Sequence, residues 1–423
     1  MSSSVYLLKT RRFAPLFGTQ FLGAFNDNLF KNTLAVILTF YTSQWTSIDA
    51  SVLVPVIGAT FILPFFLFSG IAGEICDRYN KAQLARVVKA WEIFLMALAT
   101  LGFWIHSFEL LLMIVFGMGV HSTLFGPIKY SIIPQHMREN ELITANALVE
   151  SGTFAAILLG TILGGLLSVF PNGGIIAGCV ATLIAILGYI FSRFIPSAPS
   201  IIPYAPISLN LPLQTLNALR LAYKNRIVFL AILAISWFWL YGALLLSQFP
   251  TLVKTILRGD ESTVTLLLSL FTLGVGAGSI ACEKLSAHTI RPSLIVIGAA
   301  GMALFGIDFA FAIQTFHPHI ALYETLEFWR ILIDLMFIGV FGGLYSVPLY
   351  TIMQSRSDAE VRSRIISANN ILNALFMVAG AVFTVLLLKN GWNIPYILLA
   401  AALITAVLAI ALALKIKALE NNE

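Results

Sequence analysis

The sequence predicts an all-α membrane protein, with 12 transmembrane helices arranged as two six-helix halves. Apolar residues make up 59% of the 423 residues and charged residues only 11%, whereas a soluble domain carries about 25% charge. The apolar residues come in long runs, and a helix needs about 20 of them to cross a bilayer. A water-soluble enzyme would need more polar surface, and a disordered chain would have fewer apolar residues, so both classes are excluded.

The predicted spans follow the chain in two groups of six. The first group covers residues 13–42, 49–74, 84–106, 109–134, 142–170 and 173–193. The second group covers residues 227–250, 263–282, 292–314, 326–352, 365–388 and 394–416. The segment between them holds five prolines, which is typical of a linker, and an amphipathic stretch near 213–223. We therefore expect an N-terminal half at 1–193, a cytoplasmic linker at 194–226 and a C-terminal half at 227–423.

Lys and Arg side chains fall unevenly between the two sides of the predicted spans. Twenty lie on the side of both termini and the linker, and three, Lys254, Arg258 and Lys389, lie on the other. Because cytoplasmic loops carry an excess of Lys and Arg, both termini are expected in the cytoplasm. The three cysteines show no metal-binding or redox spacing, and no basic run indicates nucleic-acid binding, so we expect no metal, cofactor or nucleic-acid partner.

Two motifs recur about half the chain apart. Pro127–Gln135 is echoed by Pro348–Gln354, and Ile143–Asn146 is echoed by Ile366–Asn369. Six spans separate the copies, so each pair keeps the same orientation in the membrane. Parallel repeats with a substrate site near the membrane midplane are a known plan of transporters.

The loop after the second predicted span, Gly73–Lys81, resembles the signature loop of the major facilitator superfamily. Gly73 allows close helix approach, and Asp77 can cap a helix and pair with a cation. Arg78 and Lys81 are expected to hold the cytoplasmic face. These residues are therefore predicted to form a latch that breaks when the cytoplasmic side opens; a solvated turn is the alternative. Asn80 replaces the second glycine of the motif.

Charged and amide side chains interrupt three predicted spans of the first half. Asp27, Asn28 and Lys31 lie in one span, and Asp27 and Lys31 have the i,i+4 spacing of an ion pair. Lys129 and Glu150 lie in two others. A charge at bilayer depth is costly, so each is a candidate functional residue. A carboxylate and an ammonium facing a cavity would suit a zwitterionic head group, while a permanent structural cluster is the alternative.

Other charges within the spans are assigned structural roles from their spacing. Glu92, beside Lys89, is expected at the cytoplasmic interface, and Arg330 and Asp334 are expected to form an i,i+4 pair, with an outer gate as the alternative. His121 is a candidate proton carrier, but a lone buried histidine is more often a packing residue that is hydrogen-bonded.

Three segments of the first half resemble the bacterial lysophospholipid transporter family, LplT, a branch of the major facilitator superfamily. They are Gln20–Asn28, Phe125–Tyr130 and Ala145–Glu150. The resemblance implies inward movement of lysophospholipid, chiefly lysophosphatidylethanolamine, from the outer to the inner leaflet of a bacterial inner membrane. It also brings Asp27 and Lys129 forward as the polar pair that binds the head group.

The resemblance further implies that an acyltransferase restores the missing chain after transport. The sequence contains neither the His and Asp spacing of an acyltransferase nor a phosphate-binding loop, so a separate acyltransferase and acyl-carrier-protein ligase is the expected partner. The expected molecule is a monomeric transporter among membrane lipids, not an enzyme. Its expected substrate-binding set is Asp27, Asn28, Lys31, Lys129, Tyr130 and Glu150. The alternative is a proton-coupled exporter of small amphipathic drugs or metabolites, with Asp27 or Glu150 as the carrier.

Overall fold

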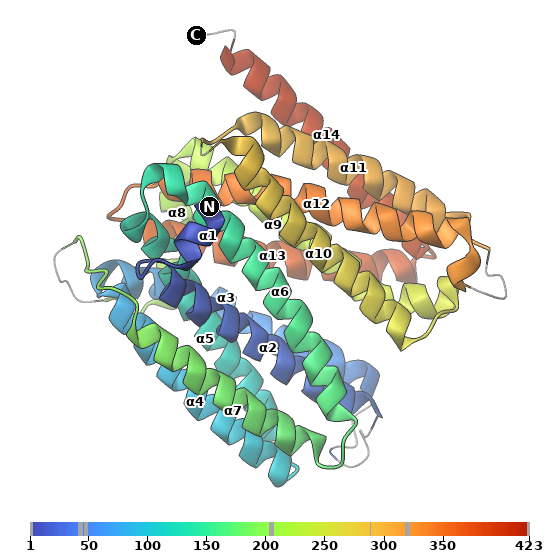
Figure 1. Cartoon of the computed structure of the whole chain (residues 1–423), viewed down its shortest axis with the longest axis horizontal. Helices are drawn as coiled ribbons and strands as arrows, with labels where there is room; N and C mark the ends of the chain where they lie inside the picture. Colours follow the sequence, from blue (N-terminus) through green and yellow to red (C-terminus); the bar gives the residue numbers. More distant parts are fainter. Residues whose placement is uncertain are drawn as a thin grey trace. The chain divides into compact units, whose positions relative to one another are not determined.

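The computed structural model describes residues 3–40, 45, 50–202, 207–287, 289–317 and 322–420, and within these ranges it contains helices and no β-strand (Figure 1). The helices up to the linker are α1 (Ser3–Leu8), α2 (Ala14–Phe40), α3 (Ala50–Arg78), α4 (Lys81–Trp104), α5 (Phe108–His136), α6 (Leu142–Ser168), α7 (Gly173–Arg193) and α8 (Leu211–Lys224). They are followed by α9 (Arg226–Leu252), α10 (Glu261–Ser286), α11 (Pro292–Gln314), α12 (Leu326–Ser355), α13 (Arg362–Lys389) and α14 (Ile394–Glu420). Each predicted span coincides with one of these helices to within a few residues, and α8 covers the predicted amphipathic stretch.

Among the described residues, 11 helices are long and apolar enough to cross a membrane. The predicted span at 13–42 corresponds to α2, which is not among them. Length is not the reason, because the 27 residues of α2 extend over about 40 Å. The polar stretch that includes Asp27 and Lys31 lowers its hydropathy instead. The helix that the sequence singles out for function is thus also the least typical as a lipid-facing span.

Local sequence signals set where several helices begin. Asn80 precedes α4 and accepts a hydrogen bond from an amide of its first turn at 3.0 Å, and Ser107 does the same for α5 at 3.2 Å. Such caps satisfy amides that have no partner within the helix. Asp260 caps α10. Hydrogen bonds from the Ser262 hydroxyl and the Thr263 amide lower the pKa of Asp260 to about 2.

The packing of the helices divides the chain into two compact units. The first unit comprises Met1–Ala145, Ala156–Leu230 and Met353–Ala374, and the second comprises Asn146–Ala155, Ala231–Ile352 and Leu375–Glu423. Helices α2–α5, α7 and α8 belong wholly to the first unit, whereas α10, α11 and α14 belong to the second. Each unit therefore takes segments from both predicted halves, and the predicted boundaries at 193 and 226 stay a prediction.

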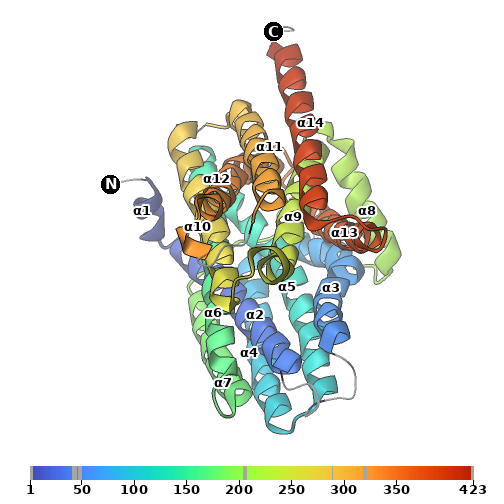
Figure 2. The same cartoon turned by 90° about the vertical axis from the view of Figure 1, so that its right-hand side faces the viewer.

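In the first unit, α7 packs against α4 and α2, while α3 packs against α5 and α8 (Figures 1 and 2). Buried apolar side chains of α2, α4, α5 and α7 form its core. They include Leu34, Phe103, Met118 and Ala181. Small residues let α7 approach α4 closely, since a Cβ added to Gly178 would lie 2.8 Å from the Cα of Thr100. This core fixes the helices that carry the candidate site.

In the second unit, α11 packs against α14, and α10 approaches α12 at a pair of glycines. A Cβ added to Gly274 on α10 would lie 3.1 Å from the Cα of Gly339 on α12. Aromatic rings fill the unit where the short segment of α6 enters it. The ring centroid of Phe154 lies 6.1 Å from those of Phe238 and Trp239 on α9. The interior of this unit is thus mainly apolar and aromatic.

Candidate functional site

The charged side chains of α2 contact α5 and α3 within the first unit. Asp27 is partly buried, and its Oδ2 accepts a hydrogen bond from the Ser122 hydroxyl of α5 at 2.7 Å. Its other oxygen, Oδ1, is covered and has no hydrogen-bond donor within the described residues. Lys31, one turn further along α2, places its ammonium 3.8 Å from the ring centroid of Phe61 on α3. In the described part of the chain, the expected ion pair between Asp27 and Lys31 is not formed, because each side chain has a partner on a neighbouring helix.

The two asparagines that follow Asp27 on α2 both donate hydrogen bonds to backbone carbonyls. Asn28 donates to the carbonyl of Ala24 in its own helix at 2.7 Å. Asn32 donates to the carbonyl of Thr161 on α6 at 2.8 Å and so joins two helices of the first unit. The amide of Asn28, which the sequence places in the substrate-binding set, is therefore already engaged within α2.

A cluster of buried polar side chains lies beside Asp27 between α2, α4 and α5. This Glu92 cluster consists of Asn26, Lys89, Glu92 and His121, which are 0%, 0%, 0% and 2% exposed. Glu92 Oε1 accepts a hydrogen bond from Asn26 Nδ2 at 2.8 Å. Glu92 Oε2 contacts the Lys89 ammonium and lies 3.1 Å from His121 Nε2. One carboxylate thus contacts polar side chains of three helices.

The Glu92 cluster corrects the expectation that Glu92 and Lys89 lie at the cytoplasmic interface, because both are fully buried in the first unit. The sequence carries a signal for this that average hydropathy hides. Both residues fall in the buried row of α4, which repeats every three or four residues: Ala85, Lys89, Glu92, Met96 and Ala99. Across the described ranges, no group of three His, Cys, Asp or Glu side chains could hold a metal ion.

Two glycines make room for the Lys89 side chain. A Cβ added to Gly23 on α2 would lie 3.2 Å from the Lys89 ammonium, and one added to Gly188 on α7 would lie 2.6 Å from its Cε. A methyl group at position 188 would therefore require the end of the Lys89 side chain to shift. A buried ion pair is tolerated when its geometry is good and additional hydrogen bonds are present, and Asn26 supplies one such bond to Glu92.

Lys129 and Tyr130 lie further along α5. Ser122 and Lys129 share one face of this helix, two turns or about 10 Å apart. The Lys129 ammonium lies 4.4 Å from the ring centroid of Tyr130, which is buried. Asp27 and Lys129 do not form an ion pair in the described residues. Glu150 is fully buried in the segment of α6 that belongs to the second unit, whereas Asp27 and Lys129 belong to the first.

Asp77, which the sequence places in a loop, lies in the last turn of α3 and contacts the start of α13 within the first unit. Asp77 Oδ1 accepts a hydrogen bond from the Ser363 amide at 2.9 Å. Asp77 Oδ2 accepts from the Arg364 amide at 3.3 Å and from its Nε at 3.1 Å. Asp77 therefore caps the N-terminus of α13, where a carboxylate is favoured, and pairs with a cation. These are the two contacts that the sequence indicates for Asp77, while its role as a latch stays a prediction.

The two basic residues of the predicted loop lie at helix ends, Arg78 at the end of α3 and Lys81 at the start of α4. Arg78 pairs with Glu74, one turn earlier in α3, at 2.5 Å. Lys81 is buried at the start of α4, where its amide donates to the carbonyl of Ala198 in the linker at 2.9 Å. Lys81 therefore connects the loop to the linker, and its expected part in the latch stays a prediction.

Gly73 lets α3 approach the first turn of α13. A Cβ added here would lie 2.8 Å from the Cα of Arg364 and 2.9 Å from the carbonyl oxygen of Ser363. Both are backbone atoms, which cannot rotate away. We therefore expect Gly73→Ala to lower the free energy of unfolding by about 1–3 kcal/mol, the usual cost of overpacking. An SDS titration of the purified protein in mixed micelles measures this change.

The matched control for this substitution lies in the same helix. No atom lies within 4 Å of a Cβ added to Gly58, so Gly58→Ala should leave the free energy of unfolding unchanged or raise it slightly. If the two variants lose equal stability, close approach of α3 and α13 is not what Gly73 provides.

Arg330, on α12 of the second unit, has a different partner from the one that its spacing indicates. The expected i,i+4 partner is Asp334, but Arg330 binds Asp308 on α11, with Nε 3.0 Å from Oδ2 and a second contact to Oδ1. The Arg330 and Asp308 side chains are 47% and 42% exposed, whereas Asp334 is buried. Two parallel contacts between a guanidinium and one carboxylate are more stabilising than a single contact along the surface of one helix.

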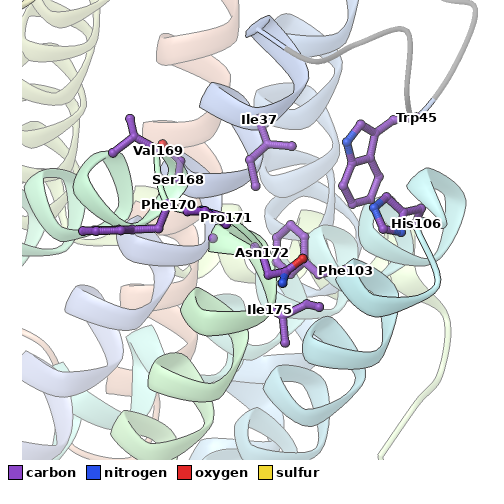
Figure 3. A pocket seen from close by; sticks show the side chains of 12 residues that line it. Ile37, Trp45, Phe103, His106, Ser168, Val169, Phe170, Pro171, Asn172 and Ile175 are labelled. Atoms are coloured by element: carbon purple, nitrogen blue, oxygen red, sulfur yellow. The ribbon is translucent and has the colours of Figure 1, made fainter.

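A cavity of about 360 Å³ opens in the first unit where α4, α6 and α7 end or begin (Figure 3). The Trp45 ring lies against His106, with centroids 4.9 Å apart, and meets Phe103 edge to face. No Asp, Glu, Lys or Arg lines the cavity. Its α2 wall is formed by Ile37, ten residues beyond Asp27, so this cavity is separate from the charged groups described above.

The comparisons with known proteins agree with this architecture. The chain is 27% identical to the Lysophospholipid transporter LplT of Shigella boydii serotype 4 (strain Sb227) over 369 residues, which cover 85% of each protein. The same values hold for the Lysophospholipid transporter LplT of Escherichia coli O157:H7. Among solved structures, the human organic anion transporter MFSD10 (TETRAN) superimposes with a TM-score of 0.76 at 14% identity, over 95% of this chain and 99% of that one.

A second solved structure shows the same fold. FucP in the outward conformation superimposes with a TM-score of 0.70 at 15% identity, over 95% of this chain and 98% of that one. The family model of the Major Facilitator Superfamily matches residues 16–381, which is most of the sequence. With its many apolar helices and its intramembrane charges, the chain is a multi-pass membrane transporter, and it belongs to the Major Facilitator Superfamily.

Proposed function

We propose that this transporter moves lysophospholipids, chiefly lysophosphatidylethanolamine, from the outer to the inner leaflet of a bacterial inner membrane. The activity in the names of its relatives supports the substrate class. The charge distribution of the loops supports an orientation with both termini and the linker in the cytoplasm. In this proposal the chain acts as a monomer, and a separate acyltransferase and acyl-carrier-protein ligase reacylates the delivered lipid.

The observation that carries this proposal is that two opposite charges on α2, Asp27 and Lys31, are not paired with each other. Asp27 has one oxygen without a donor, and Lys31 contacts an aromatic ring rather than a carboxylate, within the residues described. The two side chains lie one helical turn apart, with Cβ atoms about 6 Å from each other. A phosphoethanolamine group also carries an ammonium and a phosphate a few atoms apart, so it can contact both side chains at once.

The proposed binding mode follows from these positions. The lipid ammonium donates to Asp27 Oδ1, while Ser122 continues to hold Oδ2. The phosphate takes the Lys31 ammonium away from the ring of Phe61. Lys129, on the same face of α5 as Ser122, also contacts the phosphate. The acyl chain stays in a hydrocarbon environment. Exchange of partners within an apolar unit avoids leaving a bare charge at bilayer depth, where it would be costly.

The proposed transport step is a rocking motion of two halves around this head-group site. The contact of Asp77 with the first turn of α13 closes the cytoplasmic side in one state and breaks in the other. Glu150 and Tyr130 remain proposed members of the substrate-binding set.

Uptake by proteoliposomes tests the head-group assignment. Lysophosphatidylethanolamine should enter about 10–100 times faster than lysophosphatidic acid with the same acyl chain, because the second lipid lacks the ammonium that would bind Asp27. Monoacylglycerol, which lacks both charges, should enter at the rate of empty liposomes. Equal uptake of the three lipids contradicts the proposal. Efflux of a small amphipathic cation driven by a proton gradient, without lipid uptake, would instead support the exporter.

A further inference from the structure

The helix of the linker, α8, is docked on the first unit through one face only. Its buried face consists of Gln214, Ala218 and Ala222, which are spaced by four residues. A Cβ added to Gly70 on α3 would lie 2.6 Å from the backbone carbon of Gln214, so the two helices meet backbone to backbone. Figure 2 shows α8 beside α3. The helix is therefore held firmly in one orientation.

The opposite face of α8 exposes apolar side chains. Leu213 and Leu216 are each 43% exposed, and Tyr223 is 69% exposed. The exposed apolar surface continues into α9, where Ile227 is 57% exposed. A helix with an apolar face and basic residues at its end, joined to two membrane spans, is expected to lie in the lipid interface.

Next to this face lies a cavity of about 520 Å³, formed where α8, the start of α9 and α13 meet within the first unit. Its lining consists of Leu219, Arg220, Tyr223, Lys224, Phe229 and Leu372. Tyr223 and Phe229 meet edge to face, with ring centroids 5.2 Å apart, and form one wall. The cavity therefore combines an apolar interior with two basic side chains at its edge.

The charge around this cavity is positive. Arg220, Lys224 and Arg226 are exposed, and the sequence contains no Asp or Glu between Glu150 and Asp260. Asn225, which follows α8, donates a hydrogen bond to the carbonyl of Arg356 in the turn before α13, and that turn contains Asp358 and Glu360. Basic residues flank and outnumber the acidic ones there. An anionic group is thus the favoured ligand.

We propose that α8 and this cavity form a binding site for one anionic phospholipid of the leaflet on the linker side of the membrane. The phosphate of the lipid contacts Arg220 and Lys224. One acyl chain enters the cavity against Leu219, Phe229 and Leu372, and the other lies along Leu213 and Leu216. This site goes beyond the proposed transport of lysophospholipid and is distinct from Asp27 and Lys31. The proposed orientation of the transporter decides only whether this leaflet is the cytoplasmic one.

Native mass spectrometry of the purified full-length chain tests the proposal. The protein in a neutral detergent is titrated with phosphatidylglycerol and, separately, with phosphatidylcholine of the same acyl chains. We expect phosphatidylglycerol to bind more tightly, and the double variant Arg220→Gln/Lys224→Gln to bind it roughly 25-fold more weakly, about fivefold for each lost charge. Higher salt should reduce the difference, because exposed charges are screened.

The matched control is the double variant Lys284→Gln/Arg291→Gln, which removes two exposed basic residues of the second unit and should leave binding unchanged. Leu372→Trp keeps the charges but fills the cavity, so it should weaken phosphatidylglycerol binding several-fold. Leu375→Trp, at a 47% exposed position of α13 outside the cavity, should not. Equal binding of the two lipids, or an equal loss of phosphatidylglycerol affinity in both double variants, would overturn the proposal. The exposed face of α8 would then be assigned to contact with a protein partner.

Discussion

Replacement of Glu92 by leucine is expected to lower the free energy of unfolding by about 3–5 kcal/mol, because it leaves the Lys89 ammonium buried without a carboxylate. Lys89 has no exposed surface and lies between Gly23 and Gly188, so it cannot reach water without moving helices apart. The Asn26 amide would lose its acceptor, and the His121 ring would lose its contact with the carboxylate. An SDS titration in mixed micelles measures the loss.

Two further variants separate the ion pair from simple packing. The double variant Lys89→Met/Glu92→Leu removes both charges at similar volume, and it should be closer in stability to the wild type than Glu92→Leu is. Glu109→Leu removes an exposed carboxylate at the start of α5 and should change stability by no more than about 0.5 kcal/mol. The single variant Lys89→Met completes the comparison. If the double variant loses as much free energy of unfolding as Lys89→Met and Glu92→Leu lose together, the pair is not energetically coupled.

Asp27→Asn is expected to reduce the initial rate of lysophosphatidylethanolamine uptake by about 10–100-fold, which corresponds to the loss of one charged hydrogen bond of about 1.5–3 kcal/mol. Asparagine has nearly the same shape, and its oxygen can still accept the hydrogen bond from Ser122. The fold should therefore persist while the negative charge that attracts the lipid ammonium is gone. Proteoliposomes with equal amounts of reconstituted protein provide the measurement.

The charge-matched control for Asp27→Asn is Glu109→Gln, at an exposed position far along α5 from Lys129. This variant should transport at the wild-type rate. Unchanged uptake by a well-folded Asp27→Asn variant would remove Asp27 from the head-group site, whatever the substrate of the transporter is.

The positions of the helices could be predicted from the sequence because length and hydropathy are local properties. Every predicted span corresponds to a helix, and the α8 segment was indicated by its amphipathic pattern. The two kinds of contact that Asp77 makes could also be predicted, because a carboxylate is stabilised by a helix N-terminus and by a cation. Its particular partners, Ser363 and Arg364, lie 286 and 287 residues away, and no local pattern identifies them.

The partners of the intramembrane charges were harder to predict for the same reason. Spacing along one helix suggested Lys31 for Asp27 and Asp334 for Arg330, but the structure places Ser122 and Asp308 there instead. Packing between helices offers a side chain better geometry than the surface of its own helix does. Hydropathy averaged over a span does not reveal the burial of Glu92, whereas its position in the buried row of α4 agrees with it.

The narrow space around the Lys89 side chain also restricts how this protein can change over generations. An alanine at 188 would place its Cβ 2.6 Å from the Cε of Lys89, so a change of this glycine depends on the residue at 89. A shorter residue at 89 would make room for a larger residue at 188, and Glu92 would then lose the Lys89 ammonium as its counter-ion. We therefore expect the three positions to be inherited as a set.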